Sequence, residues 1–302
     1  MNTDETIRAW RKRLQDERLA PRTISFYCET AHAVLAIMDR LNLHTHPHQI
    51  GPEDVQKLLD YLKDEKYAVQ TRKGYLTTLR RFASSFDNPF LNDWPRPRFP
   101  HDSRPNADWL DADQARALID CDKSPIQTIV IHLELCLGLR HVEVIRLRNA
   151  DIDKKTETIQ VRGKGPEGGK PRIVPYAAGT GDAIGVWSNH RLKMVAEGRR
   201  RHPKTFTDPD EFIVWSKAGV LHPYSEEGYG LDKVVTLPLS SELGFDFSNH
   251  TLRRTFGRAL YRAGVEVPTI AAILGHESTD VTLKYIGVNL DDMRDAMRRE
   301  IF

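Results

Sequence analysis

The sequence has few cysteines and no long hydrophobic run, and both absences exclude classes of protein. Its three cysteines, Cys28, Cys121 and Cys136, are odd in number and widely spaced, so they indicate neither a disulfide framework nor a zinc site. No stretch approaches the roughly 18 apolar residues that a membrane-spanning helix needs. The chain opens MNTDETIRAW, without an apolar signal segment, and we therefore expect a cytoplasmic protein.

Net charge is also small, at +2 over 302 residues, and by itself it gives no nucleic-acid signal. The local distribution of charge is more informative. Between His250 and Arg262 there are four arginines and no acidic residue. Such a stripe is often only a solvated helix face, so it acquires meaning only together with other features.

The first part of the chain shows the pattern of a small helical bundle. Ile7, Trp10 and Leu14 keep a three-then-four spacing that gives one apolar stripe. We expect further helices over 21–40, from 52 onward, and over 69–86, with prolines at two of the starts. The basic side chains expected on its outer face, where they could contact nucleic-acid phosphates, are Arg72, Lys73, Arg80 and Arg81.

The length of the chain favours two domains, because single cores rarely exceed ~250–300 residues. A proline-rich segment over 89–107 predicts a linker between a helical domain, 1–88, and a second domain, 108–302. In the second domain, alternation predicts strands over 158–162 and 172–175 joined by a turn-rich tip over 163–170. Its other expected elements are helices starting after Asp111 and over 126–137, 181–197, 252–263, 268–274, 279–286 and 290–301. The predicted fold is mainly α with a small β-sheet.

Several residues suited to phosphodiester chemistry recur in a fixed order along this second domain. They are Gly138-Leu139-Arg140, Gly163-Lys164-Gly165, His250-Thr251-Leu252-Arg253, Leu274-Gly275-His276 and Tyr285. A tyrosine can attack phosphorus and conserve the bond energy in a phosphotyrosyl ester. Arginine suits the nonbridging oxygens, because its planar fork holds two of them and stays protonated.

Each of these pieces is weak when taken alone. A tyrosine near the end of a chain usually packs in a core, and Gly-Leu-Arg is also a common helix stop. Lys164 and Lys170 lie in a glycine-rich turn, but Pro171 stands where a nucleotide-binding P-loop requires serine or threonine. The alternating run His44-Thr45-His46-Pro47-His48 lacks the cysteine or acidic support of a zinc site, so we assign no metal.

Taken jointly, the order and spacing of these motifs resemble the tyrosine recombinases, the phage-integrase and Xer-type site-specific recombinases. The resemblance covers essentially the whole chain. It implies a helical core-binding domain followed by a catalytic domain, which together form a C-shaped DNA clamp. It also implies that the chain needs neither divalent metal nor ATP, because each broken ester is stored as a phosphotyrosyl bond and then returned.

The resemblance also implies a role for each matching residue. Arg140 and Arg253 would hold the scissile phosphate, and His276 would donate a hydrogen bond to it. Tyr285 would form the 3′-phosphotyrosyl link. The remaining roles are proton transfer at the nucleophile by His250, protonation of the leaving 5′-oxygen by Lys164, and support of Arg140 from behind by Glu143.

The sequence departs from the commonest family pattern in one place, because Arg254 follows Arg253 where many relatives have histidine. We expect Arg254 to play a supporting part there. Lys170 could share DNA contacts or part of the role assigned to Lys164. We take His141, beside Arg140, to be a bystander.

The implied function is site-specific strand exchange on double-stranded DNA with paired recombination sites, through a Holliday junction. The expected assembly is a homotetramer on DNA, and a monomer or dimer when free, with accessory DNA-bending factors and a nucleoid-associated location. The apolar stripe over about 290–302 would either dock on a neighbouring protomer or pack on its own domain. The alternatives are a type IB topoisomerase-like enzyme and a non-catalytic DNA-binding protein of the same fold.

Overall fold

The structure is a computed structural model that describes residues 3–88, 97, 99, 109–163, 171–225 and 230–287. The chain divides into two compact units, Met1–Arg104 and Pro105–Phe302, each with its own hydrophobic core. The division falls inside the segment 89–107 that composition predicts to be a linker, most of which lies outside the described residues. Among the described residues, no helix combines the length and apolar character that crossing a membrane requires.

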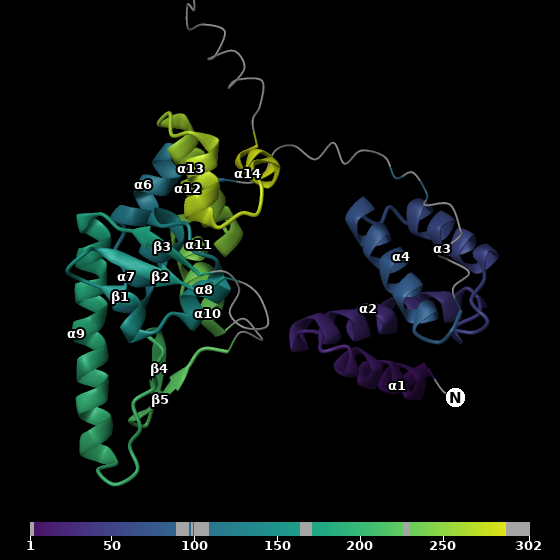
Figure 1. Ribbon diagram of the computed structural model, residues 1–302, viewed down its shortest axis with the longest axis horizontal. Helices are drawn as coiled ribbons and strands as arrows, with labels where there is room; N and C mark the ends of the chain where they lie inside the picture. Colours follow the sequence, from purple (N-terminus) through teal and green to yellow (C-terminus); the bar gives the residue numbers. More distant parts are fainter. Residues whose placement is uncertain are drawn as a thin grey trace, which may run out of the picture. The chain divides into compact units, whose positions relative to one another are not determined.

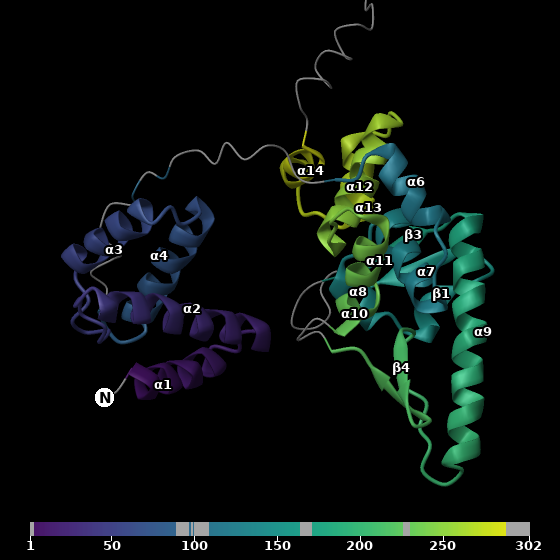
Figure 2. The same cartoon turned by 180° about the vertical axis from the view of Figure 1, so that it is seen from behind.

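The first unit is a bundle of the expected helices, α1 (Thr3–Asp16), α2 (Pro21–Arg40), α3 (Pro52–Asp64) and α4 (Val69–Ser84) (Figures 1 and 2). Proline opens both α2 and α3, where its missing N–H costs no helical hydrogen bond. At the start of α3 the Asp54 carboxylate accepts a hydrogen bond from the Gly51 N–H at 2.8 Å. Local sequence signals therefore set the helix starts of this unit.

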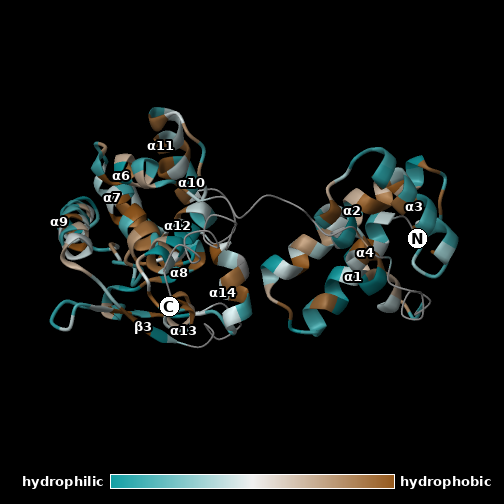
Figure 3. Cartoon of the chain, turned by 90° about the horizontal axis from the view of Figure 1, so that it is seen from above, coloured by the Kyte–Doolittle hydropathy of each residue, from teal (hydrophilic) through white to brown (hydrophobic). Residues whose placement is uncertain are grey.

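Trp10 lies at the centre of this bundle and is fully buried. Its indole N–H donates to the Ser85 hydroxyl at 2.9 Å, and its ring meets Phe82 edge-on at 5.0 Å. The helices carry both hydrophobic and hydrophilic residues (Figure 3), which fits one buried and one exposed face for each. The predicted stripe of Ile7, Trp10 and Leu14 is buried as expected.

The second unit is mainly helical, with two small antiparallel sheets, which confirms the predicted fold class. Its first elements are α6 (Ala112–Asp120), α7 (Pro125–Ile131), the π-helix η1 (His132–Cys136), α8 (His141–Arg146) and the 3-10 helix η2 (Asn149–Asp151). The strands and the long helix follow as β1 (Ile152–Asp153), β2 (Thr158–Val161), β3 (Arg172–Pro175), α9 (Ala178–Arg201), β4 (Val214–Lys217) and β5 (Val220–Pro223). The last helices described are α10 (Gly230–Val234), α11 (Thr236–Leu243), α12 (Asn249–Arg262), α13 (Val267–Leu274) and α14 (Thr279–Ile286).

The β2–β3 hairpin forms with the predicted strands and an antiparallel register in which Val161 pairs with Arg172. Strand β1 adds to its other side, in the order β1-β2-β3. Residues 164–170 of the predicted tip lie outside the described residues.

Three predictions about the second unit need correction. The β4–β5 hairpin was not predicted, because the segment after 175 was interpreted as mostly helical. Helix α9 extends beyond the predicted 181–197 at both ends and runs beside that hairpin (Figure 1). The helix predicted over 126–137 changes at His132 from α to π hydrogen bonding. Apolar periodicity does not reveal such a change of hydrogen-bond register.

The helices that carry the motif residues begin at serine caps or end at a glycine. The Ser248 hydroxyl caps α12 by accepting from the Thr251 N–H at 3.2 Å, and Ser278 caps α14 in the same way. Gly275 ends α13 with a left-handed conformation, φ +63°, as predicted. Helices α12, α13 and α14 consequently form one group that contains His250, Arg253 and Tyr285 (Figure 1).

Candidate active site

Gly138 makes the turn that places Arg140 at the start of α8. Its φ is +64°, a left-handed conformation in which most side chains are strained. A Cβ on Gly138 would also lie 2.4 Å from the Phe256 ring and 2.8 Å from Leu274. Only glycine therefore fits this close approach of the turn to α12 and α13.

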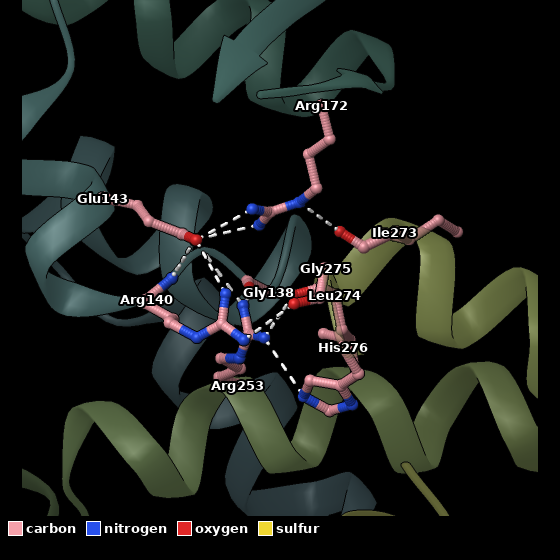
Figure 4. Close-up of polar contacts among 9 residues, drawn as sticks. All are labelled: Gly138, Arg140, Glu143, Arg172, Arg253, Ile273, Leu274, Gly275 and His276. Atoms are coloured by element: carbon pink, nitrogen blue, oxygen red, sulfur yellow. Dashed lines mark hydrogen bonds and ion pairs between the residues drawn. The ribbon is translucent and has the colours of Figure 1, made fainter. Parts of the chain in front are cut away.

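Glu143, in the first turn of α8, is fully buried, and three arginines converge on its carboxylate (Figure 4). Its carboxylate accepts from the Arg140 backbone N–H at 2.7 Å and from the Arg140 guanidinium at 2.8 Å. Arg172 donates to both carboxylate oxygens, at 2.8 and 2.9 Å. Arg253 approaches the same carboxylate at 3.7 Å. We call these four residues the Glu143 cluster.

Burial raises the pKa of Glu143, but the hydrogen bonds from Arg172 and Arg140 and the charge of Arg253 lower it more. Its net pKa is below the usual value, so the carboxylate stays ionised at neutral pH. One buried negative charge thereby holds several positive charges in one place. Glu143 thus fixes the direction of the Arg140 guanidinium and also contacts two other arginines.

Arg253, in the second turn of α12, is the most deeply buried arginine of the cluster, with 2% of its surface exposed. It donates to the carbonyl oxygens of Gly138 and Leu274. Burial, followed by the charge of Arg140, lowers the pKa of Arg253 to about 10. The guanidinium is still protonated at neutral pH, and its contacts give it a fixed direction.

His276 follows the end of α13 and lies against Arg253. Its Nε2 is 3.3 Å from an Arg253 nitrogen, and its Nδ1 is 2.8 Å from the hydroxyl of the buried Thr282. Burial and the charges of Arg253, Arg140 and Arg172 lower the pKa of His276 to about 4. The imidazole is therefore neutral at pH 7. In this arrangement Nε2 accepts from Arg253 and Nδ1–H donates to Thr282.

Tyr285, on α14, stands beside these groups. Its ring meets His276 edge-on at 5.0 Å, and the guanidinium carbons of Arg253 and Arg254 lie 5.8 and 5.4 Å from its centre. Burial raises the pKa of Tyr285, and the two arginine charges oppose that rise. The hydroxyl oxygen is buried, and the Arg253 guanidinium lies close enough to favour its ionised form. Arg254 thus contacts Tyr285 through the tyrosine ring.

His250 lies in the first turn of α12, with an exposed side chain. Partial desolvation and then the charges of Arg254, Arg253 and Arg140 lower its pKa. The imidazole is therefore neutral at pH 7 and can accept a proton.

Two expectations about lysines fall on Lys164 and Lys170, which lie outside the described residues. The four basic residues predicted on the first unit are all partly buried. Arg81 forms an ion pair with Glu17 and lies over the Tyr27 ring at 5.1 Å, whereas Arg72 and Lys73 lie near the Phe99 ring. Arg81 therefore contributes to the packing of its own bundle.

The structure adds residues that the sequence patterns did not indicate. Arg172, predicted only as part of a strand, is a member of the Glu143 cluster. His141, beside Arg140, has its Nδ1 3.0 Å from the fully buried carboxylate of Glu134 in the π-helix. Both contacts join residues whose proximity depends on tertiary packing, which apolar spacing does not report.

The described residues contain no group of three or more histidine, cysteine or acidic side chains that could hold a metal ion. In the run His44–His48, the Nδ1 of His44 instead lies 3.1 Å from the Asp54 carboxylate. The charge that faces Tyr285 comes from guanidinium groups.

The sequence of this chain is similar to sequences of known proteins. Residues 108–291 match the phage integrase family. Tyrosine recombinase XerA of Saccharolobus solfataricus is 25% identical over 285 residues, which cover 90% of this chain and 84% of the relative. Tyrosine recombinase XerC of Staphylococcus epidermidis is 25% identical over 266 residues, which cover 85% and 82% of the two chains.

Two solved structures have a similar fold. The crystal structure of XerA recombinase aligns with a TM-score of 0.52 at 22% identity, over 99% of this chain and 100% of the other. The Tn1549 transposon integrase, in complex with a circular intermediate DNA, aligns with a TM-score of 0.67 at 19% identity, over 97% and 99%. Because the family match spans more than half of the sequence, this chain belongs to the phage integrase family and is a tyrosine recombinase, an enzyme that breaks and rejoins DNA.

Proposed function

We propose that the protein exchanges DNA strands between paired recombination sites, with Tyr285 as its nucleophile. The observation that carries this proposal is the convergence of four elements on one point. Arg140 from the start of α8, Arg253 from α12, His276 after α13 and Tyr285 from α14 all meet there, although 145 positions separate the first from the last.

In this proposal the arginines and His276 bind the scissile phosphate. Arg140 keeps about a quarter of its side chain exposed while Glu143 and the Gly275 carbonyl fix its guanidinium. It can therefore donate to a nonbridging oxygen without losing its support. Charge that is fixed before the reaction stabilises a transition state without reorganisation at the moment of reaction.

His276 would change its hydrogen bonds when a phosphate arrives. The neutral ring can carry its proton on Nε2 and donate to a phosphate oxygen, provided that Nδ1 then accepts from Thr282. A hydroxyl can make that exchange, because it both donates and accepts. The Thr282 hydroxyl can otherwise donate to the Ser278 carbonyl at 3.4 Å, so it has a partner in either state.

The covalent step forms the Tyr285 Oη–phosphorus bond and breaks the bond from phosphorus to the 5′-oxygen. The tyrosine proton passes to the neutral His250, and Lys164 protonates the leaving 5′-oxygen. The raised pKa of Tyr285 keeps its hydroxyl protonated until a base and the arginine charges act on it. Attack by the freed 5′-hydroxyl of a partner strand reverses the same bonds and completes the exchange.

Strand exchange requires two DNA sites, and we propose a homotetramer that assembles on them from free monomers or dimers. Each pair of active protomers would cleave one pair of strands, with a Holliday junction between the two rounds. DNA is the bound partner in the Tn1549 integrase structure, which supports double-stranded DNA as the partner here. Cytoplasmic, nucleoid-associated action and accessory bending factors are parts of the same proposal.

The test is to mix the purified protein with DNA from its source, stop the reaction with detergent, and isolate DNA attached to protein. We expect adducts with the wild type and none with Tyr285→Phe, which should still bind DNA. Sequencing the attached DNA would locate the cleavage site. Binding without any adduct, also on a nicked substrate that loses its leaving strand, would contradict the proposal and favour a non-catalytic DNA-binding protein.

Adducts alone do not separate a recombinase from a topoisomerase-like enzyme. A supercoiled plasmid with two copies of the mapped site distinguishes them. We expect deletion or inversion of the segment between the sites. Relaxation of plasmids that lack the site, without recombinant products, would contradict site-specific exchange.

A further inference from the structure

Arg258 is a buried arginine of α12 to which the proposed function gives no role. It is one of the four arginines between His250 and Arg262, and only 3% of its surface is exposed. A solvated helix face, the usual explanation of such a stripe, therefore does not apply to it. A buried guanidinium needs partners that compensate its charge, so the partners of Arg258 indicate what the residue does.

The end of α14 supplies two of these partners. The Nη1 of Arg258 donates to the carbonyl oxygens of Ile286 at 3.2 Å and Gly287 at 3.1 Å. Ile286 and Gly287 directly follow Tyr285, and they form the C-terminal end of the helix. Carbonyl groups at a helix C-terminus lack helical partners and carry partial negative charge, which a guanidinium complements. Arg258 therefore binds the backbone next to the proposed nucleophile.

The start of the second unit supplies a further partner. The guanidinium carbon of Arg258 lies 4.1 Å from the centre of the Trp109 ring, within the range of a cation–π contact. The next residue, Leu110, donates its backbone N–H to the Thr255 hydroxyl at 2.8 Å in a buried contact. These two residues are thus fixed to α12 at two places. The tryptophan ring consequently restricts the directions that the guanidinium can take.

Helix α14 depends on such contacts because it is short. It has eight residues, whereas isolated helices of fewer than about 12 residues are marginal in water. Gly287, with φ +65°, ends the helix two residues after Tyr285. A Cβ on Gly257 of α12 would lie 4.0 Å from the Tyr285 ring, so the two helices lie close together there (Figures 1 and 2). Arg258, the next residue along α12, binds the end of α14 at this close approach.

We propose that Arg258 is a positioning residue that fixes Tyr285 for attack on the scissile phosphate. Its guanidinium, oriented by the Trp109 ring, anchors the end of α14. The inference rests on the proposed function of Tyr285 as the nucleophile. In this account Arg258 does not contact the DNA. Misplacement of a reacting group by about 1 Å can slow a reaction about 10²-fold, so loss of the anchor should impair the covalent step more than DNA binding.

A merely structural role for Arg258 predicts a different outcome. If the residue only filled space in the core, its loss would loosen α12, α13 and α14 together, and with them Arg253 and His276. DNA binding and cleavage would then fall together, and amide exchange would rise in all three helices. A positioning role confines the change in exchange to α14 and the change in activity to the cleavage rate.

The experiment makes two measurements on the full-length protein. Hydrogen exchange followed by mass spectrometry compares the peptide over 279–287 with peptides from α12 and α13. Single-turnover cleavage of a duplex with the mapped site is measured over a range of protein concentrations. It gives the maximal cleavage rate and the concentration that produces half of that rate, which separate the covalent step from DNA binding.

We expect Arg258→Ala to exchange the amides of 279–287 about tenfold faster or more, because buried carbonyls lose their hydrogen bonds. Exchange in α12 and α13 should stay as in the wild type. The maximal cleavage rate should fall about 10²-fold, with the half-saturating concentration unchanged. Arg258→Lys keeps the charge but loses the planar fork, so it should fall between wild type and Arg258→Ala in both measurements.

Substitutions of Trp109 test the orientation of the guanidinium. Trp109→Ala should raise exchange in the same peptide and slow cleavage about tenfold, a smaller effect than that of Arg258→Ala. Trp109→Phe keeps an aromatic face and should stay near wild type. The double variant with Trp109→Ala and Arg258→Ala should be no slower than Arg258→Ala alone, because the ring acts through the arginine.

Arg191 provides a matched control for the loss of a buried arginine. Its guanidinium also donates to backbone carbonyls of the second unit, those of Pro209 and Glu211. Arg191→Ala should leave the exchange of 279–287 and the maximal cleavage rate unchanged. If Arg258→Ala does not fold, as judged by circular dichroism, Arg258→Lys and Trp109→Ala supply the same comparison.

The possible failures are distinguishable. The positioning role is overturned if Arg258→Ala cleaves at the wild-type rate, or if exchange rises equally in α12, α13 and α14. A rise in the half-saturating concentration that accounts for the whole loss of cleavage would also overturn it. In each of these cases Tyr285→Phe still forms no adducts. Adducts formed by Tyr285→Phe would instead overturn the proposed nucleophile, and the inference about Arg258 with it.

Discussion

At the residue scale, a single buried carboxylate holds together the arginines of the candidate active site. Glu143 is surrounded by Arg140, Arg172 and Arg253, and each guanidinium also donates to a backbone carbonyl. Removing one partner of such a buried group leaves an uncompensated charge, which costs several kcal/mol in typical cases, about 3–5. The cluster therefore fixes the orientation of each guanidinium, whereas an exposed arginine without partners would sample many rotamers.

Arg253→Ala should reduce DNA cleavage by about 10²–10³-fold, because fixed positive charge at phosphorus is lost. Single-turnover cleavage of the mapped site measures the effect, with DNA binding and circular dichroism as controls for folding. Near-normal cleavage by a folded Arg253→Ala protein would remove this residue from phosphate binding.

The lowered pKa of His276 makes a prediction about stability and pH. In the unfolded chain the histidine pKa is near its usual 6.5, and in the folded protein it is about 4. The unfolded state therefore binds more protons between these values, so the free energy of unfolding falls as pH drops through this window. The contribution is fully present above pH 6.5.

A comparison of wild type with His276→Gln isolates this titration. The difference between their free energies of unfolding should be constant above pH 6.5 and should shift against the wild type as pH falls toward 4. Urea denaturation at a series of pH values measures it. A difference that does not change with pH would show that His276 is not held neutral.

The residues that the sequence revealed and those that it missed differ in a physical way. Arg140, Arg253, His276 and Tyr285 stand in short motifs whose order is itself a signal, and the structure brings these four together. Arg172 opens a predicted strand, but the alternation of that strand assigns it no role in the site. Its contact with Glu143 joins positions 29 apart, and its contact with Ile273 joins positions 101 apart, so only the folded chain shows its place.

At the element scale, the turn at Gly138 connects the π-helix to α8 and sets the direction of Arg140. Gly138→Ala should lower the free energy of unfolding by more than about 2 kcal/mol, since left-handed strain of about 1–2 kcal/mol adds to overpacking of about 1–3. The added Cβ would meet Phe256 and Leu274, so cleavage should fall as well. Urea denaturation and cleavage assays on the same preparations measure both effects.

Gly244→Ala is the matched control. Gly244 also has a left-handed backbone, φ +72°, but a Cβ there meets nothing within 4 Å. This variant should show only the strain, about 1–2 kcal/mol, and retain cleavage. Equal losses in the two variants would mean that the close packing of the Gly138 turn is unimportant.

The elements of the fold were predictable where a local rule specifies them. Apolar stripes and prolines predict α1 to α4, and the alternation of apolar and polar residues predicts β2 and β3. The β4–β5 hairpin was missed although its turn, Ala218-Gly219, has two positive φ values typical of a tight hairpin. Its strands are short and alternate poorly, with a buried Val214 followed by three exposed residues. The π-helical turn after His132 has no periodic signal at all.

At the scale of the whole molecule, the chain has two units with separate cores, and the phage integrase match covers most of the second. The segment 290–302 lies outside the described residues, and a truncation experiment distinguishes its two predicted roles. Deleting it should impair recombination more than DNA binding if its apolar stripe docks on a neighbouring protomer. A recombination assay and a binding assay on the truncated protein decide this, and equal losses in both would indicate packing on its own domain.

The most direct test of the whole account is to identify the tyrosine that becomes attached to DNA. Adducts trapped with detergent would be digested with nuclease and protease, and mass spectrometry would locate the nucleotide on a peptide. The account predicts attachment at Tyr285 through a 3′-phosphate. Attachment at another of the nine tyrosines would contradict it, for example at Tyr261, which packs against the same apolar residues as Tyr285.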